Sequence, residues 1–138
     1  MRLRGAMFAP ALLVVAACGF GGSEPSEPEK LSGMQEYESI EAMVDDFGER
    51  GLNCDITMDK NTRYATEAGR CQMLDTEMVL SIFSDTRQMD NQRGTNQLLA
   101  SAGIDYGLLI GANWTVNCGS EADCEAVKAK IGGRIEAG

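Results

Sequence analysis

The sequence predicts an α+β fold, a small antiparallel sheet of about four strands with helices packed on one face. Apolar residues recur with helical spacing in some segments and gather in short, strand-like runs in others. The first three strand-like runs are separated by short polar turns, which favours an antiparallel meander. The expected order of elements is α-β-β-β-α-β-α within residues 34–138, a length typical of one domain.

The first helix is expected to begin at Ser32, because Ser32 and Gln35 have the spacing of a capping box. Gly48 or Gly51 would end it, since glycine is the preferred residue just after a helix. Its apolar face would consist of Tyr37, Ile40, Met43, Val44 and Phe47.

Three strands are expected next. Residues 52–58 form the first and residues 63–74 the second. A tight turn at Asp75 and Thr76 then leads into the third strand, 77–83. This third run is apolar on both faces, which is typical of a central strand.

A second helix is expected from Ser84 or Asp85, with Gln88 three residues after Asp85 as a capping partner. It would continue through residues 86–103. Its apolar content is low, and Gly94 weakens it further because glycine has a low helix propensity.

In the last third of the chain, the sequence predicts either one strand over residues 106–118 or two strands joined by a turn at 111–113. A third helix is expected from Ser120, because Asp123 stands in the capping-box position. Residues 134–138 would add an edge strand or fray.

The N-terminus, residues 1–17, has the organisation of a secretory signal peptide. Arg2 and Arg4 precede an apolar run that is shorter than the roughly 20 residues needed to span a bilayer. The letters VAAC, which end at Cys18, resemble the lipobox of bacterial lipoproteins. The resemblance implies cleavage before Cys18 and a diacylglycerol on its thiol, which places the protein at the cell membrane, facing away from the cytoplasm. An ordinary signal peptide cut nearby and a core helix are the alternatives.

A tether is expected after the anchor, in residues 18–33. This segment is rich in Gly, Ser, Pro and Glu, and such a composition cannot bury a core. A flexible chain of this length spans roughly 20 Å. It would hold the domain of residues 34–138 clear of the lipid headgroups, and the two acyl chains would supply the membrane contact.

The charge of the chain is strongly acidic. Removing residues 1–17 takes away Arg2 and Arg4 and no acidic residue, so the formal net charge of −9 becomes −11. Such a domain repels nucleic acid and anionic lipid, so neither is an expected partner. A basic partner protein would suit it, as would a simple solvated surface.

Disulfides are expected because the exported location is oxidising. The chain has five cysteines, and lipidation of Cys18 leaves four, which allow three pairings. The favoured pairs are Cys54 with Cys71, across neighbouring strands, and Cys118 with Cys124, from a strand end to the first turn of a helix.

The sequence offers little catalytic chemistry. It contains no histidine, which excludes Ser-His-Asp and Cys-His catalysis and most transition-metal sites. It also lacks phosphate-binding and zinc-protease motifs. Asp55, Asp59 and Asn61 are spaced loosely like cation ligands, but the glycine and closing glutamate of a calcium loop are missing. The expected protein is not an enzyme and holds no metal or cofactor.

Beyond the lipobox, the layout looks like small uncharacterised lipoproteins of high-GC Gram-positive bacteria. The features that carry this resemblance are Cys54, Cys71 and the stretches VLSIF and LLIGANWTVNC. The resemblance implies no activity and no site residues.

The function predicted from these observations is a surface-tethered, non-enzymatic binding domain with an envelope or extracellular protein partner. An inhibitor or exclusion factor is one specific form of this function. Tyr106, Asn113 and Trp114 are the candidate recognition residues, at one end of the sheet. The structural alternative for Trp114 is that its side chain anchors the core or the end of the sheet and takes no part in recognition. The alternative function is capture of a small molecule or metal for a transporter.

Overall fold

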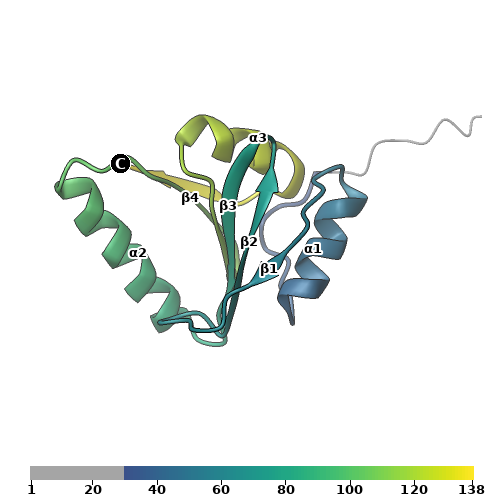
Figure 1. The fold of residues 1–138 in the computed structure, drawn as a ribbon, viewed down its shortest axis with the longest axis horizontal. Helices are drawn as coiled ribbons and strands as arrows, with labels where there is room; N and C mark the ends of the chain where they lie inside the picture. The colour runs from purple at the N-terminus through teal and green to yellow at the C-terminus, as the bar shows by residue number, and fades with distance from the viewer. Residues whose placement is uncertain (1–29) are drawn as a thin grey trace, which may run out of the picture.

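The computed structural model describes residues 30–138, which form three helices and one antiparallel sheet of six strands (Figure 1). The predicted α+β class is confirmed. The signal peptide, Cys18 and most of the tether lie outside the described residues. The helices are α1 (Ile40–Glu49), α2 (Thr86–Ser101) and α3 (Glu121–Ile131), and the strands are β1 (Thr57–Met58), β2 (Glu67–Met73), β3 (Thr76–Ile82), β4 (Gly107–Ile110), β5 (Trp114–Asn117) and β6 (Arg134–Ala137).

The strands lie in the order β1-β2-β3-β5-β4-β6, so the prediction of about four strands was too low. The run 106–118 splits into the β4–β5 hairpin, and the C-terminal segment adds β6 at one edge. β3 lies between β2 and β5, as its apolar character on both faces predicts.

The helices cover both faces of the sheet, which corrects the prediction that they share one face (Figure 1). α1 and α3 lie over one face and α2 over the other. The reason is visible in β4, whose Leu109 joins the apolar cluster under α1 and α3 while Leu108 and Ile110 join the cluster under α2. A sheet that is apolar on both faces must be covered on both.

The first helix begins later than predicted. Ser39, not Ser32, is the N-cap of α1, and its hydroxyl accepts a hydrogen bond from Ala42 N at 3.0 Å. The Ser32 hydroxyl instead accepts from Met34 N within a turn. Gly33 has a φ of +89°, which is incompatible with a helix. Residues 32–38 are therefore not helical.

The segment before α1 crosses the C-terminal end of α3 and then the β4–β5 turn. Leu31 N donates to the carbonyl of Lys130 at 3.4 Å, and Ala112 N donates to the carbonyl of Gly33 at 3.0 Å. Gly33 is buried. The folded part of the chain thus begins near Leu31, whereas the sequence placed the end of the tether at residue 33.

The predicted strand 52–58 is reduced to the two residues of β1. Leu52 is buried, and its N–H donates to the carbonyl of Phe47 at 2.9 Å, which ties this segment to the end of α1. The strand pairing starts only at Thr57, opposite Arg70. Residues 52–56 therefore pack against α1 and do not pair with β2.

The turn between β2 and β3 is centred on Leu74 and Asp75, one residue earlier than predicted. Both have positive φ, 52° and 62°, which is the signature of the two-residue turn that suits the twist of a hairpin. The register places Met73 opposite Thr76.

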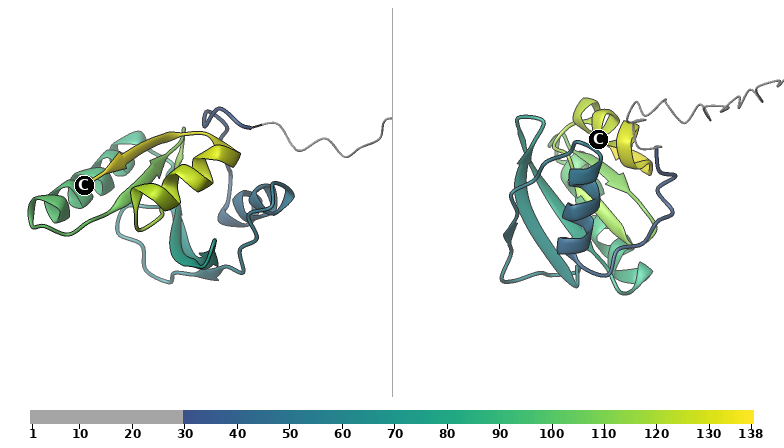
Figure 2. Two further views of the ribbon diagram at one scale, coloured as in Figure 1. Left: turned by 90° about the horizontal axis from the view of Figure 1, so that it is seen from above. Right: turned by 90° about the vertical axis from the view of Figure 1, so that its right-hand side faces the viewer.

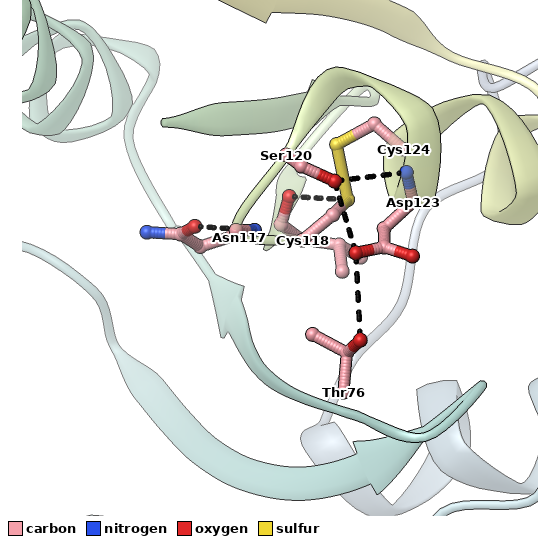
Figure 3. The surroundings of a disulfide bond; sticks show 8 residues. Thr76, Asn117, Cys118, Ser120, Asp123 and Cys124 are labelled. Atoms are coloured by element: carbon pink, nitrogen blue, oxygen red, sulfur yellow. Dashed lines mark hydrogen bonds between the residues drawn. A yellow bond between two sulfur atoms is a disulfide. The ribbon is translucent and has the colours of Figure 1, made fainter. Parts of the chain in front are cut away.

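Both favoured disulfides are present. Cys54 bonds to Cys71, with Cα atoms 5.4 Å apart, and Cys118 bonds to Cys124, with Cα atoms 5.3 Å apart. Figure 3 shows the second bond at the start of α3. There Ser120 caps the helix by accepting from Asp123 N at 3.2 Å, and its own hydroxyl donates to the Asp123 carboxylate at 2.9 Å.

The two disulfides are expected to stabilise the domain unequally. They close loops with sequence separations of 17 and 6 residues. By loop-closure entropy, replacing both cysteines with alanine should cost about 3 kcal/mol at Cys54–Cys71 and about 2 kcal/mol at Cys118–Cys124. Urea unfolding of the two double variants measures both costs. If removing either bond left the unfolding midpoint unchanged, that bond would not hold the native fold.

Candidate functional site

Trp114 lies in the core and is fully buried. Its indole Nε1 donates to the carbonyl of Gln35 at 2.9 Å, and its ring centroid lies 6.2 Å from that of Tyr37. Gly111 permits this position, because a Cβ there would collide with the indole ring. Of the two roles predicted for Trp114, the structure therefore assigns the anchor.

Asn113 fastens the segment before α1 to the β4–β5 turn. Its side-chain oxygen accepts from Tyr37 N at 3.0 Å, and its Nδ2 donates to the carbonyl of Tyr37 at 2.8 Å. The backbone carbonyl of Asn113 accepts from Phe83 N at 2.9 Å. One residue thus joins the end of β3, the hairpin turn and the pre-helix segment.

Tyr106 lies far from these two residues in the fold. It precedes β4, at the other end of the hairpin from Asn113, and its ring packs in the cluster under α2, whereas Trp114 belongs to the cluster under α1 and α3. The structure does not bring the three predicted residues to one recognition surface. Tyr106 and Trp114 are core residues, and for Trp114 the sequence had already offered that role as the alternative.

A groove is nevertheless present at the end of the sheet where Asn113 lies. Two hollows of about 250 and 340 Å³ adjoin there and share Glu36, Phe83, Ser84 and Asn113. We call them together the sheet-end groove. Its remaining lining residues are Tyr37, Glu38, Thr66, Ile82, Asp85, Thr86, Met89 and Ala112.

The floor of the sheet-end groove is apolar and its rim is acidic. Ile82, Phe83 and Met89 are buried side chains. Glu36 and Glu38 are exposed on the rim and make no hydrogen bond or ion pair within residues 30–138. None of the residues that line the groove is basic.

Several other polar groups of the sheet-end groove already have structural partners. Asp85 is the N-cap of α2, and its carboxylate accepts from Arg87 N at 2.8 Å. The hydroxyl of Thr66 accepts from Ser84 N at 3.0 Å. The charged groups left for a ligand are therefore the two glutamates, above an apolar floor. A side chain with an apolar stem and a cationic head, lysine or arginine, matches that arrangement.

A buried network beside the groove has a structural role. The Tyr37 hydroxyl donates to the Asp46 carboxylate at 2.5 Å, and Arg50 Nε pairs with Asp46 at 3.2 Å. Burial, reinforced by the bond to Asp46, raises the pKa of Tyr37 above its ordinary value. The hydroxyl thus stays protonated at neutral pH and holds the pre-helix segment against α1.

Polar contacts join α2 to the sheet beside the apolar cluster. Arg93 Nη2 pairs with Glu136 of β6 at 2.7 Å, and Gln92 Nε2 donates to the Thr115 hydroxyl at 3.4 Å. Burial acts to raise the pKa of Glu136, but the hydrogen bond and charge of Arg93 outweigh it, so this pKa lies below its ordinary value. The pair therefore adds stability above the ordinary carboxyl pKa, and this contribution is lost as the pH falls through the lowered value.

Within residues 30–138, no group of three or more His, Cys, Asp or Glu side chains is placed to hold a metal ion. None of the helices in the same range is long and apolar enough to cross a bilayer. No protein family, curated protein or solved structure shows significant similarity to the chain.

Proposed function

We propose that the protein is a lipid-anchored, non-enzymatic interaction domain of the cell envelope that binds a basic segment of a protein partner in the sheet-end groove. The anchor is the diacylglycerol implied at Cys18 by the resemblance to the lipobox. The two disulfides support an exported location, because such bonds persist in oxidising compartments.

The observation that carries this proposal is the pair of free carboxylates over an apolar floor. Glu36 and Glu38 lie on the rim without a cationic neighbour in the lining, and Phe83 and Met89 lie beneath them. Burying an apolar stem on this floor favours binding, and the carboxylates select for a positive head group.

The charge of the whole chain acts in the same direction. Its formal net charge is −9, and −11 after removal of residues 1–17. A negative field raises the association rate of a basic partner and repels nucleic acid and anionic lipid. Because the proposed anchor holds the domain outside the cytoplasm, the partner would reach it from the envelope or from outside the cell. An inhibitor or exclusion factor that occupies a basic patch of an envelope protein is one specific form of this function.

Reversing the two rim charges is expected to weaken partner binding about a hundredfold. In Glu36→Lys/Glu38→Lys each attraction becomes a repulsion, and a loss of about 1.4 kcal/mol per site lowers the affinity about tenfold each. The measurement is crosslinking in intact cells followed by quantitative mass spectrometry of the recovered partners. Glu49→Lys/Glu125→Lys is the matched control, because both residues are exposed and lie outside the groove.

The same variants separate this proposal from its alternative. If the partner is recovered equally from the rim variant and the control, the groove is not the binding site. Capture of a small cationic solute for a transporter uses the same groove chemistry. It predicts instead that free amines raise the melting temperature of the wild type and leave that of Glu36→Lys/Glu38→Lys unchanged.

A further inference from the structure

β6 forms an open edge of the sheet. It pairs with β4 alone, in a register that places Leu108 opposite Glu136 and Leu109 opposite Ile135. Tyr106 and Gly138 exchange both of their backbone hydrogen bonds, at 3.3 and 3.2 Å. Because such exchange alternates along an antiparallel ladder, Glu136 also points its backbone groups at β4, and Ile135 points its own N–H and C=O outward.

The outward backbone groups have no partner within the described part of the chain. No hydrogen bond to the N–H or C=O of Ile135 or Ala137 is formed outside the ladder with β4. The pre-helix segment crosses the chain at Gly132 and Gly133, just before β6 begins. In the left view of Figure 2 the yellow β6 runs between α2 and α3, which pack on opposite faces of the sheet. The open edge therefore extends from Arg134 to Ala137.

The charged side chains along this edge are complementary to those of a second, antiparallel copy of the same strand. Arg134 and Glu136 point to the α2 face, where Arg134 Nη1 lies 3.4 Å from the Glu136 carboxylate, and the Arg134 side chain is 62% exposed. Ile135 points to the other face and packs against the cluster under α1 and α3. In an antiparallel pair centred on Ile135, Arg134 of each copy stands directly opposite Glu136 of the other.

We propose that a second copy of this chain pairs with the first along β6, antiparallel and with Ile135 on the two-fold axis. The two sheets become one continuous sheet. Ile135 of each copy donates to and accepts from Ile135 of the other, which satisfies the outward groups at the centre of the edge. Arg134 and Glu136 form reciprocal ion pairs on both sides of the axis.

The charge pattern selects a second copy over another segment. An unrelated strand could add to the edge through its backbone, but its side chains would need to present a positive and a negative charge at the two matching positions. A second copy presents them by symmetry. The dimer uses residues outside the sheet-end groove, so it does not depend on the proposed function.

Analytical ultracentrifugation tests the dimer on residues 18–138, exported with an ordinary signal peptide and with Cys18→Ala to remove the acyl group. The wild-type sequence should sediment as a dimer, and Arg134→Glu should weaken the dimer at least about tenfold, because the like-charge pair occurs twice. Lys130→Glu makes the same charge change at an exposed position of α3 and should dimerise like the wild type. A monomeric wild type at about 500 µM, or an Arg134→Glu variant that dimerises normally, would overturn the proposal.

A charge exchange tests the register. Arg134→Glu and Glu136→Arg should each dimerise at least about tenfold more weakly than the wild type. Combined, they should form a mixed dimer, since every cross-strand pair is then complementary. Absence of the mixed dimer between two folded variants would refute this register.

Amide exchange covers the case in which Glu136→Arg fails to fold after losing its contact with Arg93. In the wild type, the amide of Ile135 should become protected as the protein concentration rises, while the inward amide of Glu136 is protected throughout. Exchange of the Ile135 amide at a rate independent of concentration would exclude pairing at this edge.

Discussion

Replacing Cys18, the expected site of lipidation, should release the protein from the membrane into solution. Each buried CH₂ of an acyl chain contributes about 0.8 kcal/mol, so two chains hold a protein stably while none of the acidic domain needs to touch lipid. The variant replaces residues 1–17 with an ordinary secretory signal peptide and carries Cys18→Ala. It should appear in the soluble fraction, whereas the wild type should partition into detergent.

The mass of the N-terminal peptide provides the direct measurement. In the wild type, this peptide should begin at Cys18 and carry the mass of a diacylglycerol. A peptide that begins elsewhere, or one with a free thiol at Cys18, would contradict the lipoprotein assignment. The control combines the native residues 1–18 with an unrelated soluble domain, which should become detergent-soluble if this segment is sufficient for anchoring.

Trp114→Ala is expected to destabilise the domain by about 3–5 kcal/mol, the cost of deleting a fully buried tryptophan. The loss has two parts. A cavity opens between Tyr37 and the sheet, and the carbonyl of Gln35 loses its donor. Since a domain of this size has about 5–15 kcal/mol in total, the variant should lose a large share of its stability and unfold at a much lower urea concentration than the wild type. Far-UV circular dichroism during urea unfolding measures the change without relying on tryptophan fluorescence.

Trp114→Phe separates the two parts. It retains an aromatic ring and removes only the Nε1 donor and part of the volume, so it should cost about 1–3 kcal/mol. If Trp114→Ala cost less than Trp114→Phe, the indole would not be the anchor of the pre-helix segment. The same substitutions should also loosen the sheet-end groove, because Glu36 and Glu38 lie on the segment that Trp114 and Asn113 hold.

Local sequence patterns predicted the elements best where no contact with a distant residue competed with them. The N-caps Asp85 and Ser120 are where the capping rule places them, and both disulfides join the favoured cysteines. The first helix shows the limit of such patterns. Ser32 and Ser39 can both cap a helix, and the choice depends on Asn113, which is distant in sequence and holds the backbone of Tyr37 in a non-helical path.

The candidate site was predictable only in part. The sequence pointed to the sheet end at Asn113, and the groove lies there. It also pointed to Trp114 and Tyr106, because an aromatic residue beside glycine or asparagine can be either an anchor or a binding platform. Burial decides between these roles. Glu36 and Glu38 fall within the helix that the sequence predicts from Ser32, where they would be two of many solvated acidic residues.

By itself the sequence determined the α+β class and the central place of β3, and it favoured the two cysteine pairs that form, because each depends on periodicity or on short loops. The tertiary structure decided which sheet face each helix covers, where α1 begins and which side chains share the sheet-end groove. These features depend on contacts between residues far apart in the chain, such as Tyr37 with Asn113 and Arg93 with Glu136. No local spacing encodes such contacts, because they form only when the sheet brings both partners together.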